Sequence, residues 1–240
     1  MNYNINYELQ PGRSLGRQYK VVEFLGNGWE GEVYKVEERS TRILRAAKLF
    51  YKHRYLKRKM PHVEYAKKLH KIQACPIVIQ YHYQDSVRLK GESVDFLVSD
   101  FVDGEVLSEY LARQPDRRML PFEALHLFYA LVQGVEQIHF LGEYHGDIHL
   151  DNIMVKRRGL GFDVHLIDLL HLGPSNKMQI QQDVYDLIAV FYELIGGKKY
   201  YARMPQAIKQ FVLGKKSNLI AKRFKVAGHL RLFLENVEWG

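Results

Sequence analysis

The spacing of hydrophobic positions along the chain changes at about residue 102. Before it, short apolar runs over residues 19–50 alternate with polar turns, which predicts three strands with a glycine-rich turn between the first two. Behind a proline, apolar side chains then recur at every third or fourth position over about residues 61–72, as they do in a helix. Further strands are expected near residues 77–83 and 94–99. This part of the chain therefore predicts a small five-stranded antiparallel sheet with one helix.

Helical spacing dominates the rest of the chain. Apolar residues repeat every three or four positions over residues 121–141 and again over 184–195, where two glycines follow. Between these helices, short strands are expected near residues 153–155 and 164–167, on either side of a turn. The remainder of the chain also predicts helices.

These elements predict an α+β fold in a single domain, residues 1–240, with two lobes. The N-lobe is expected at about residues 18–101 and the C-lobe at about 102–240, behind a polar lead-in segment of residues 1–17. With 240 residues, of which 47% are hydrophobic and 26% charged, the chain can bury a substantial core.

Composition also limits the compartment and the partners. The single Cys75 cannot form an internal disulfide, and the first six residues lack the basic start and apolar run of a signal peptide, so a cytoplasmic location is expected. No apolar run approaches the roughly 20 residues that span a bilayer, and no membrane insertion is expected. The net charge of +8 favours an anionic partner, which two basic clusters at residues 52–59 and 215–225 could bind, although a solvated helix face is the simpler interpretation of each. Nucleic acid is not the expected partner.

Three glycines in the first hairpin are typical of a phosphate-binding loop. Gly26, Gly28 and Gly31 would let the backbone approach phosphates without obstruction by Cβ atoms, and Val33 would cover one face of a purine. The same spacing also fits a tight hairpin that binds nothing, so this motif has to be judged with the others.

A lysine lies inside the third predicted strand. Because an unpaired ammonium in a hydrophobic strand is costly, Lys48 is expected to have an anionic partner. Glu64 on the following helix could supply it, and the pair could then hold Lys48 against phosphate oxygens. An exposed edge-strand lysine and a surface glutamate are the alternative.

A second group of polar residues follows the helix at residues 121–141. Asp147 could orient an acceptor hydroxyl, while Asn152 and Asp168, expected at neighbouring strand ends, could bind Mg²⁺ through oxygen. Each residue alone could be turn-forming. His145 and His149 could also be interpreted as zinc ligands, but no closed set of four ligands accompanies them.

Taken in order, these segments resemble the eukaryotic-type protein kinase superfamily over about residues 18–200. The stretch from Gly26 to Val33 matches Gly-x-Gly-x-x-Gly-x-Val, Ala46 to Lys48 matches an Ala-x-Lys strand, and His145-x-Asp147 resembles the catalytic loop. The resemblance implies a bilobal kinase-like fold that uses ATP and Mg²⁺.

The same resemblance implies a role for each site residue. Residues 96–104 resemble the hinge, with Ser99 as gatekeeper and the backbone of Asp100 and Val102 bonding adenine. The residues assigned to the nucleotide are Gly26, Asn27, Gly28, Gly31, Val33, Ala46, Lys48, Asp100, Val102 and Met154. Those assigned to catalysis are Asp147, Lys48, Glu64, Asn152 and Asp168, of which Asn152 and Asp168 would hold the metal. Asp183 resembles the helix aspartate that ties down the catalytic-loop backbone, and a helix N-cap is the alternative for it.

Four departures from the kinase pattern affect what the resemblance implies. Gly146 stands where many protein kinases place an arginine that binds a phosphorylated activation loop, and Asp168 is followed by two leucines rather than Phe-Gly. His149 replaces a usual lysine and makes the loop similar to those of aminoglycoside and choline phosphotransferases. The segment over residues 169–182 is short and lacks Ala-Pro-Glu.

The sequence therefore predicts an ATP-dependent phosphotransferase, with a serine/threonine protein kinase favoured and Asp147 as its base. A small-molecule kinase of the aminoglycoside or choline type is the alternative acceptor class. A pseudokinase that uses the fold as a binding module is the other alternative. Activity is favoured by the joint retention of Lys48, Glu64, Asp147, Asn152 and Asp168, because a binding module does not need the base.

Overall fold

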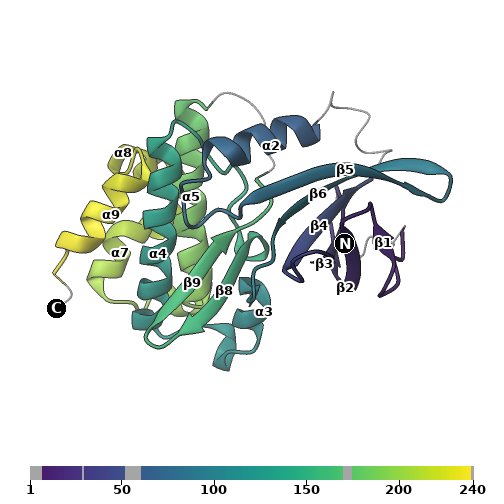
Figure 1. Ribbon diagram of the computed structural model, residues 1–240. Helices are drawn as coiled ribbons and strands as arrows, with labels where there is room; N and C mark the ends of the chain where they lie inside the picture. Colours follow the sequence, from purple (N-terminus) through teal and green to yellow (C-terminus); the bar gives the residue numbers. More distant parts are fainter. Residues whose placement is uncertain (1–6, 29, 52–60, 170–174, 239–240) are drawn as a thin grey trace. The chain divides into compact units, whose positions relative to one another are not determined.

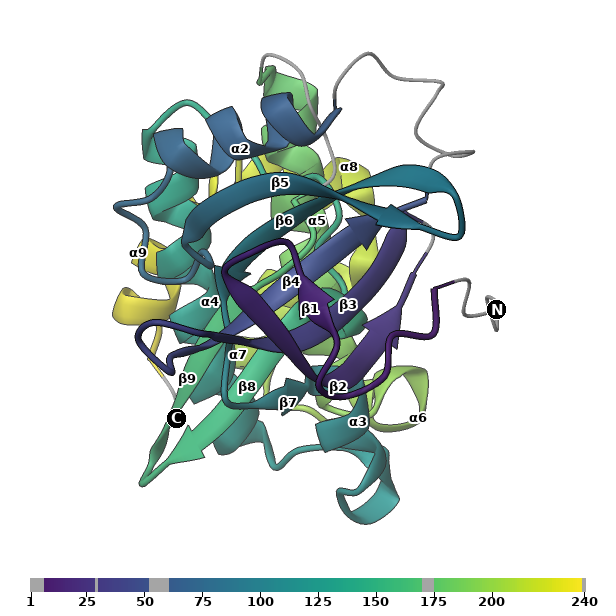
Figure 2. The same ribbon diagram turned by 45° about the vertical axis from the view of Figure 1, so that its right-hand side comes forward.

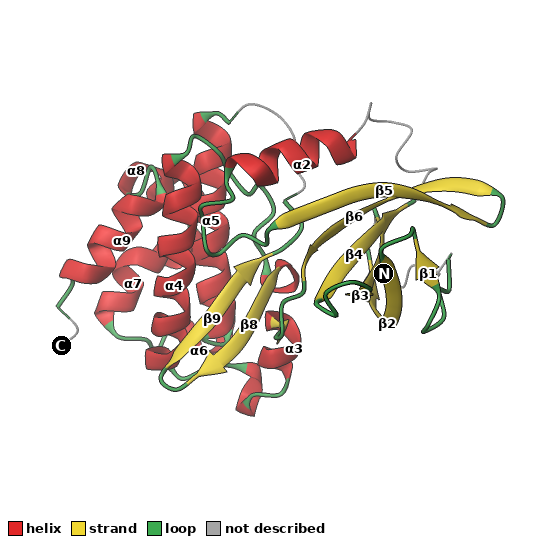
Figure 3. Cartoon of the chain, viewed as in Figure 1, coloured by secondary structure: helices red, strands yellow, loops and turns green. Residues whose placement is uncertain are grey.

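The computed structural model describes residues 7–28, 30–51, 61–169 and 175–238, with the side chains of residues 61–65 outside this description. The chain divides into two compact units (Figure 1). Unit 1 consists of Met1–Gln73 and Ile79–Val102, and unit 2 of Ala74–Val78 and Asp103–Gly240. Strands dominate unit 1 and helices dominate unit 2 (Figure 3), so the predicted α+β class is confirmed.

Unit 1 is built on an antiparallel sheet whose strands follow the order β1-β2-β3-β4-β6-β5. The strands are β1 (Ser14–Leu15), β2 (Tyr19–Asn27), β3 (Gly31–Glu38), β4 (Leu44–Phe50), β5 (Tyr81–Leu89) and β6 (Glu92–Asp100). Helix α2 (Pro61–Lys71) packs against β5 (Figure 2), in agreement with the helix predicted at about residues 61–72.

The two faces of this sheet carry different residues, since one packs into the hydrophobic core and the other carries Lys48. Cross-strand partners share a face, and successive residues of a strand alternate between faces. Tyr34 pairs with Ala47 on a face that packs into the hydrophobic core. The next pair, Val33 and Lys48, lies on the opposite face, which also carries Ala46 opposite Ser99. We call this the Lys48 face.

The sheet contains one strand more than the five expected. Ser14 and Leu15 lie in the predicted lead-in segment, yet they pair with β2 as β1, and Leu15 is fully buried in the core. Leu9, from the same segment, is also part of that core. A two-residue edge strand is too short to produce an alternating pattern, so the sequence gives no signal for it.

A buried carboxylate ties this N-terminal segment to the sheet. Glu32 is fully buried and accepts hydrogen bonds from the hydroxyls of Tyr34 at 2.5 Å and Tyr51 at 3.1 Å. It also accepts the backbone N–H of Tyr7 at 3.2 Å. Burial and the bond to Glu32 both raise the pKa of Tyr34. These bonds satisfy a carboxylate that burial alone would destabilise.

The strand predicted near residues 77–83 is displaced along the chain. Ile77 and Val78 belong to unit 2, where the carbonyl of Ile77 accepts the N–H of Leu166 at 2.8 Å and its side chain lies against Gly134. Strand β5 begins only at Tyr81. An apolar run of this length fits either a strand or a buried crossing segment, and packing against Gly134 decides between them.

Unit 2 surrounds two long buried helices, α4 (Pro121–Phe140) and α5 (Lys177–Leu194). Helix α4 matches the helix predicted at residues 121–141, whereas α5 begins seven residues before the helix predicted at residues 184–195. Phe128 and Phe191, one from each helix, lie 4.9 Å apart between ring centroids, and both contact Phe211. An asparagine cap at Asn176 starts α5, since its side chain accepts from the N–H groups of the first turn.

Shorter elements complete unit 2. They are β7 (Glu105–Val106), α3 (Leu107–Ala112), β8 (Ile153–Arg158), β9 (Gly161–Leu166), α6 (Gly197–Tyr201), α7 (Gln206–Val212), α8 (Ser217–Arg223) and α9 (Ala227–Asn236). Three single 3₁₀ turns lie at Pro115–Arg117, Leu150–Asn152 and Leu213–Lys215. Strands β7, β8 and β9 form a small antiparallel sheet. In the part of the chain that is described, no helix has the length and apolar character that crossing a membrane requires.

Candidate active site

The loop that carries Asp147 is anchored by a carboxylate of helix α5. Asp183 is fully buried, and its two oxygens accept the backbone N–H groups of His145 and Gly146, each at 2.7 Å. Asp183 is the seventh residue of α5, and the N-cap of that helix is Asn176. The predicted tie to the catalytic-loop backbone is therefore confirmed, and the N-cap alternative is wrong.

His139 adds a third hydrogen bond to the same carboxylate. Its Nε2 lies 3.1 Å from Asp183, and its Nδ1 accepts the N–H of Ala227, at the start of α9, at 3.3 Å. The ring therefore accepts at Nδ1 and donates at Nε2, as a neutral imidazole can. This connection between α4, α5 and α9 was not predicted, because a histidine in an apolar helix has no sequence signal that distinguishes it from other partly polar positions.

Asp147 is held by the second predicted residue of the loop. The amide nitrogen of Asn152 donates to the carbonyl oxygen of Asp147 at 2.9 Å and to its carboxylate at 3.1 Å. Asn152 is buried, whereas the Asp147 side chain is 40% exposed and can be reached from solvent. His149 lies 3.6 Å from the same carboxylate. The loop thus presents the Asp147 carboxylate to solvent in a fixed orientation.

His145 joins this loop to the β8–β9 hairpin. Its Nε2 donates to the carbonyl of Ile167 at 3.1 Å, and its Nδ1 accepts the N–H of Asp147 at 3.3 Å. The N–H of Ile167 in turn donates to the carbonyl of Asn152 at 3.0 Å. These bonds bring Asp168 beside Asn152, as the sequence predicted. They also occupy both ring nitrogens of His145. The described residues contain no group of three or more histidine, cysteine or acidic side chains that could hold a metal.

Two residues of this region have left-handed backbone angles. Gly146 has a φ of 87°, a conformation that residues with a side chain rarely adopt. The backbone therefore favours glycine at this position, where many protein kinases have an arginine. Asp168 has a φ of 57°, which is uncommon outside glycine and asparagine or aspartate. Asp168 lies two positions beyond the end of β9, and residues with such backbone angles are frequent at functional sites.

Unit 1 carries the predicted nucleotide residues on and beside the Lys48 face. A Cβ added at Gly31 would lie 1.9 Å from the carbonyl oxygen of Leu49, so the close approach of β3 and β4 requires that glycine. At Gly26 and Gly28 an added Cβ would meet nothing within 4 Å among the described residues. Asn27 lies between these two glycines at the end of β2. The space left open at Gly26 and Gly28 is what a phosphate-binding backbone needs.

Lys48 forms an ion pair with Glu30, which the sequence analysis did not single out. The Nζ of Lys48 lies 3.2 Å from a carboxylate oxygen of Glu30. The predicted partner, Glu64, is on α2 as expected, but its side chain lies outside the described residues, so that pairing stays a prediction. A carboxylate directly before the third glycine of a phosphate-binding loop is the signal that could have identified Glu30.

The remaining predicted residues divide between the units. Asp100 ends β6, and its carboxylate bonds Arg45 at 2.7 Å and His82 at 2.5 Å, while its N–H donates to the carbonyl of Gln80. Val102 lies two positions beyond Asp100 and is half-buried. Met154 is in unit 2, on β8, and is half-buried between the fully buried Ile153 and Val155. The predicted site residues therefore form two groups, one in each unit.

Asp186, one turn beyond Asp183, is a further titratable group near the loop. Burial raises the pKa of its carboxyl to about 6, against the lowering effect of a hydrogen bond from Gln182, and the charges of Asp183 and Asp147 act in the same direction as burial. No motif pointed to Asp186, because its pKa depends on what packs around it rather than on its neighbours in sequence.

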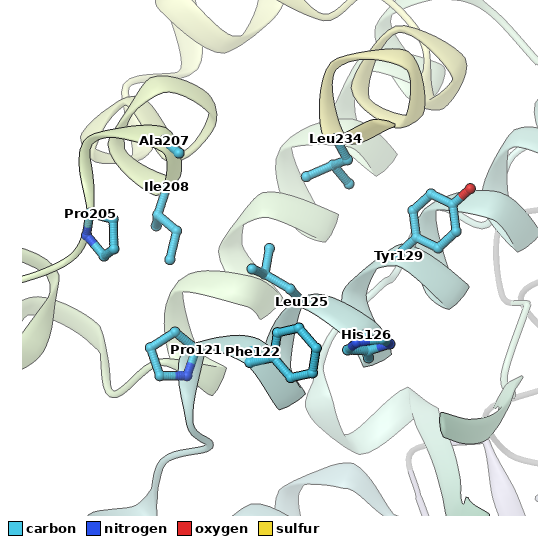
Figure 4. A pocket seen from close by; sticks show the side chains of 9 residues that line it. All are labelled: Pro121, Phe122, Leu125, His126, Tyr129, Pro205, Ala207, Ile208 and Leu234. Atoms are coloured by element: carbon cyan, nitrogen blue, oxygen red, sulfur yellow. The ribbon is translucent and has the colours of Figure 1, made fainter. Parts of the chain in front are cut away.

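An apolar pocket lies elsewhere in unit 2 (Figure 4). It has a volume of about 380 Å³ and is lined by side chains of α4, α7 and α9, among them Phe122, Leu125, Ile208 and Leu234. None of the predicted site residues lines it. Phe122 is 70% exposed at this place. The pocket is thus separate from the catalytic loop.

Comparisons with known proteins agree with the geometry. The family model for the protein kinase domain matches residues 19–221 of the chain. A probable serine/threonine-protein kinase of Streptomyces coelicolor is 27% identical over 158 residues, which is 63% of this chain and 22% of that protein. The negative regulator of sexual conjugation and meiosis of Schizosaccharomyces pombe is 28% identical over 181 residues, which is 74% of this chain and 36% of that protein.

A solved structure extends the likeness to the whole chain. A mutant of the PknI kinase domain of Mycobacterium tuberculosis superposes with a TM-score of 0.69 at 19% identity and covers 95% of this chain and 96% of that chain. At this identity the likeness concerns the fold. The chain spans between 22% and 36% of the length of the two curated relatives described above.

Proposed function

Because the chain belongs to the protein kinase family, we propose that it transfers the γ-phosphoryl group of ATP to the hydroxyl of a serine or threonine in a protein. Asp147 is the base in this proposal, and Asn152 and Asp168 are the metal ligands. The serine/threonine specificity is supported by the Streptomyces coelicolor relative, which is named as a probable kinase of this class.

The orientation of Asp147 is the single observation that carries the proposal. Its carboxylate accepts a hydrogen bond from the amide nitrogen of Asn152 at 3.1 Å, and its side chain remains 40% exposed. Asp183 holds the two residues before Asp147 through their backbone N–H groups. A general base must be both fixed and within reach of the proton that it accepts. A pseudokinase would have no use for an accessible carboxylate held in this way.

In the proposed reaction the acceptor hydroxyl approaches Asp147. The hydroxyl oxygen of the acceptor forms a bond to the γ-phosphorus while the bond from that phosphorus to ADP breaks. The hydroxyl proton passes to the Asp147 carboxylate. Because phosphoryl transfer needs little covalent chemistry from the protein, positioning and charge stabilisation supply most of the rate enhancement.

The residues present fit ATP and Mg²⁺. Both hydrogen bonds from Asn152 to Asp147 use its amide nitrogen. The amide oxygen of Asn152 and the carboxylate of Asp168 are the proposed ligands of the metal. Such oxygen donors suit Mg²⁺, which also takes phosphate oxygens and water. When bound, the metal would neutralise charge on the phosphates. In unit 1, the open backbone at Gly26 and Gly28 and the ammonium of Lys48 suit phosphates.

A small-molecule acceptor is the second candidate. His149 lies 3.6 Å from the Asp147 carboxylate, where it would face an acceptor, and its position resembles that in aminoglycoside and choline phosphotransferases. The family match and the relatives favour a protein acceptor, so this candidate is an outcome of the test.

Incubation of the purified chain with γ-labelled ATP and Mg²⁺, with and without a cell extract, tests the proposal. We expect label on serine or threonine of the chain itself or of extract proteins. Label on metabolites alone would favour the small-molecule acceptor. Thermal unfolding with ATP and Mg²⁺ distinguishes the remaining outcomes, because a ligand at 100 times its Kd stabilises the folded state by about 2.7 kcal/mol. Stabilisation without transfer would identify a pseudokinase, and a folded sample with neither would overturn the proposal.

A further inference from the structure

The glycine-rich loop carries a carboxylate that contacts the predicted phosphate-binding lysine. Glu30 directly precedes Gly31, and its carboxylate lies 3.2 Å from the Nζ of Lys48. The side chains are 28% and 13% exposed, respectively. The pair is therefore partly shielded from water, where the attraction between two charges is stronger than on an open surface.

Backbone contacts fix Glu30 in this place. The N–H of Tyr51 donates to the carbonyl of Glu30 at 2.8 Å, and the N–H of Gly28 donates to the carbonyl of Gly31 at 2.9 Å. Gly31 itself lies so close to Leu49 that no Cβ fits. Since the loop is held against the end of β4, the Glu30 side chain reaches back along that strand to Lys48.

A carboxylate and a phosphate compete for the same ammonium. We infer that Glu30 opposes nucleotide binding by occupying Lys48, so that the phosphates of ATP bind only as the Glu30 carboxylate leaves the lysine. This inference rests on the proposed function, since it concerns the regulation of the same site. If Glu30 stayed in place, its charge would repel the phosphates instead, and binding would be weakened in either case.

The direct test compares Glu30→Gln with the wild type in calorimetric titrations with ATP and Mg²⁺. Loss of the competing charge should tighten ATP binding by about two- to fivefold, the range expected for an ion pair that water still reaches. Glu37→Gln is the matched control. Glu37 lies on the same hairpin, forms an ion pair with Arg42 at 2.8 Å and pairs across strands with Leu44, four positions from Lys48. The control removes the same charge and should leave the Kd unchanged.

A second measurement examines the pair without nucleotide. The unfolding midpoints of Glu30→Gln, Lys48→Met and the double variant form a double-mutant cycle, and coupled residues give non-additive shifts. We expect the double variant to lose less than the sum of the two single losses. Additive shifts would contradict the ion pair.

The outcomes separate this inference from the proposed function. Equal or weaker ATP binding by Glu30→Gln, in a protein whose wild type binds ATP, would overturn the inference and leave the proposed function standing. Absence of binding by both folded proteins would overturn the proposed function and the inference with it. Tighter binding by both Glu30→Gln and Glu37→Gln would point to net charge and would also overturn the specific role of Glu30.

Discussion

Asn152 holds Asp147 through its amide nitrogen, which donates to both the carbonyl and the carboxylate oxygen of that residue, at 2.9 and 3.1 Å. The two residues are only five positions apart, so the loop between them closes on itself. The amide nitrogen of one side chain thereby orients the proposed base, and the amide oxygen of the same side chain is the proposed metal ligand. A change at either residue should therefore affect catalysis more than folding.

Replacing the proposed base gives the first prediction. Asp147→Asn should lower the rate of phosphoryl transfer by about 10²- to 10⁴-fold, the usual contribution of a positioned base, while the Kd for ATP stays close to the wild-type value. Single-turnover kinetics and calorimetry measure the two quantities. Asp151→Asn is the matched control, because Asp151 is in the same loop and its side chain is 70% exposed. Full turnover by Asp147→Asn would show that the catalytic loop is wrongly assigned.

The anchor of the loop gives the second prediction. Asp183→Ala would leave the N–H groups of His145 and Gly146 and the ring of His139 without their acceptor in a buried place. Each such loss costs about 1–3 kcal/mol, so the free energy of unfolding should fall by about 3 kcal/mol or more. Urea denaturation measures it. Asp163→Ala, which removes only an exposed ion pair with Arg158, should change stability little. Equal effects of the two variants would contradict the anchoring role.

Control by phosphorylation gives the third prediction. Gly146 provides no guanidinium to pair with a phosphate, and its φ of 87° disfavours any L side chain there. Ser175, the only hydroxyl residue in positions 169–182, donates to the carbonyl of Gly142 at 2.5 Å. Ser175→Ala and phosphatase-treated protein should therefore keep most of the wild-type rate. A large loss on phosphatase treatment that rephosphorylation of Ser175 restores would contradict this.

The titration of Asp186 gives the fourth prediction. Its pKa is raised to about 6, mainly by burial, with Asp183 and Asp147 acting in the same direction and Gln182 and His149 opposing. Between about pH 4 and pH 6 the unfolded chain loses this proton more readily than the folded chain, so the wild type should lose stability as the pH rises through that window. Asp186→Asn keeps an acceptor for Gln182 and does not titrate.

The Asn variant should therefore be more stable than the wild type above pH 6 and equal to it near pH 3.5. We expect the free energies of unfolding of the two proteins to differ by about 1 kcal/mol at pH 7.5. This is less than the free energy that corresponds to the full pKa shift of Asp186, because water reaches the partly exposed carboxyl. Thermal unfolding of both proteins between pH 3.5 and 7.5 checks this. A difference that does not depend on pH would contradict the raised pKa.

Much of the fold follows from local patterns. The helix Pro121–Phe140 and the part of α5 from residue 184 on were predicted, because apolar residues at helical spacing must share one buried face. The hairpins around the glycine-rich loop and before Asp168 were predicted because strands and turns each have their own signals. From the order of the motifs along the chain, we then predicted one site that contains Asp147, Asn152 and Asp168, which are close in sequence.

Tertiary structure decided what depends on partners far away in the chain. Glu30 pairs with Lys48, eighteen positions away, because the register of β3 and β4 brings them together. Likewise, the Asp183 carboxylate holds Gly146 from thirty-seven positions away because α5 packs behind the loop. The sequence by itself determined which residue types are present, which kind of element most segments form and in which order the motifs follow one another. Only packing determined which charged side chains form ion pairs with each other. The free energy of an ion pair or of a buried hydrogen bond depends on the distance between the groups and on the exclusion of water. Neither quantity can be derived from the residues that are adjacent in sequence.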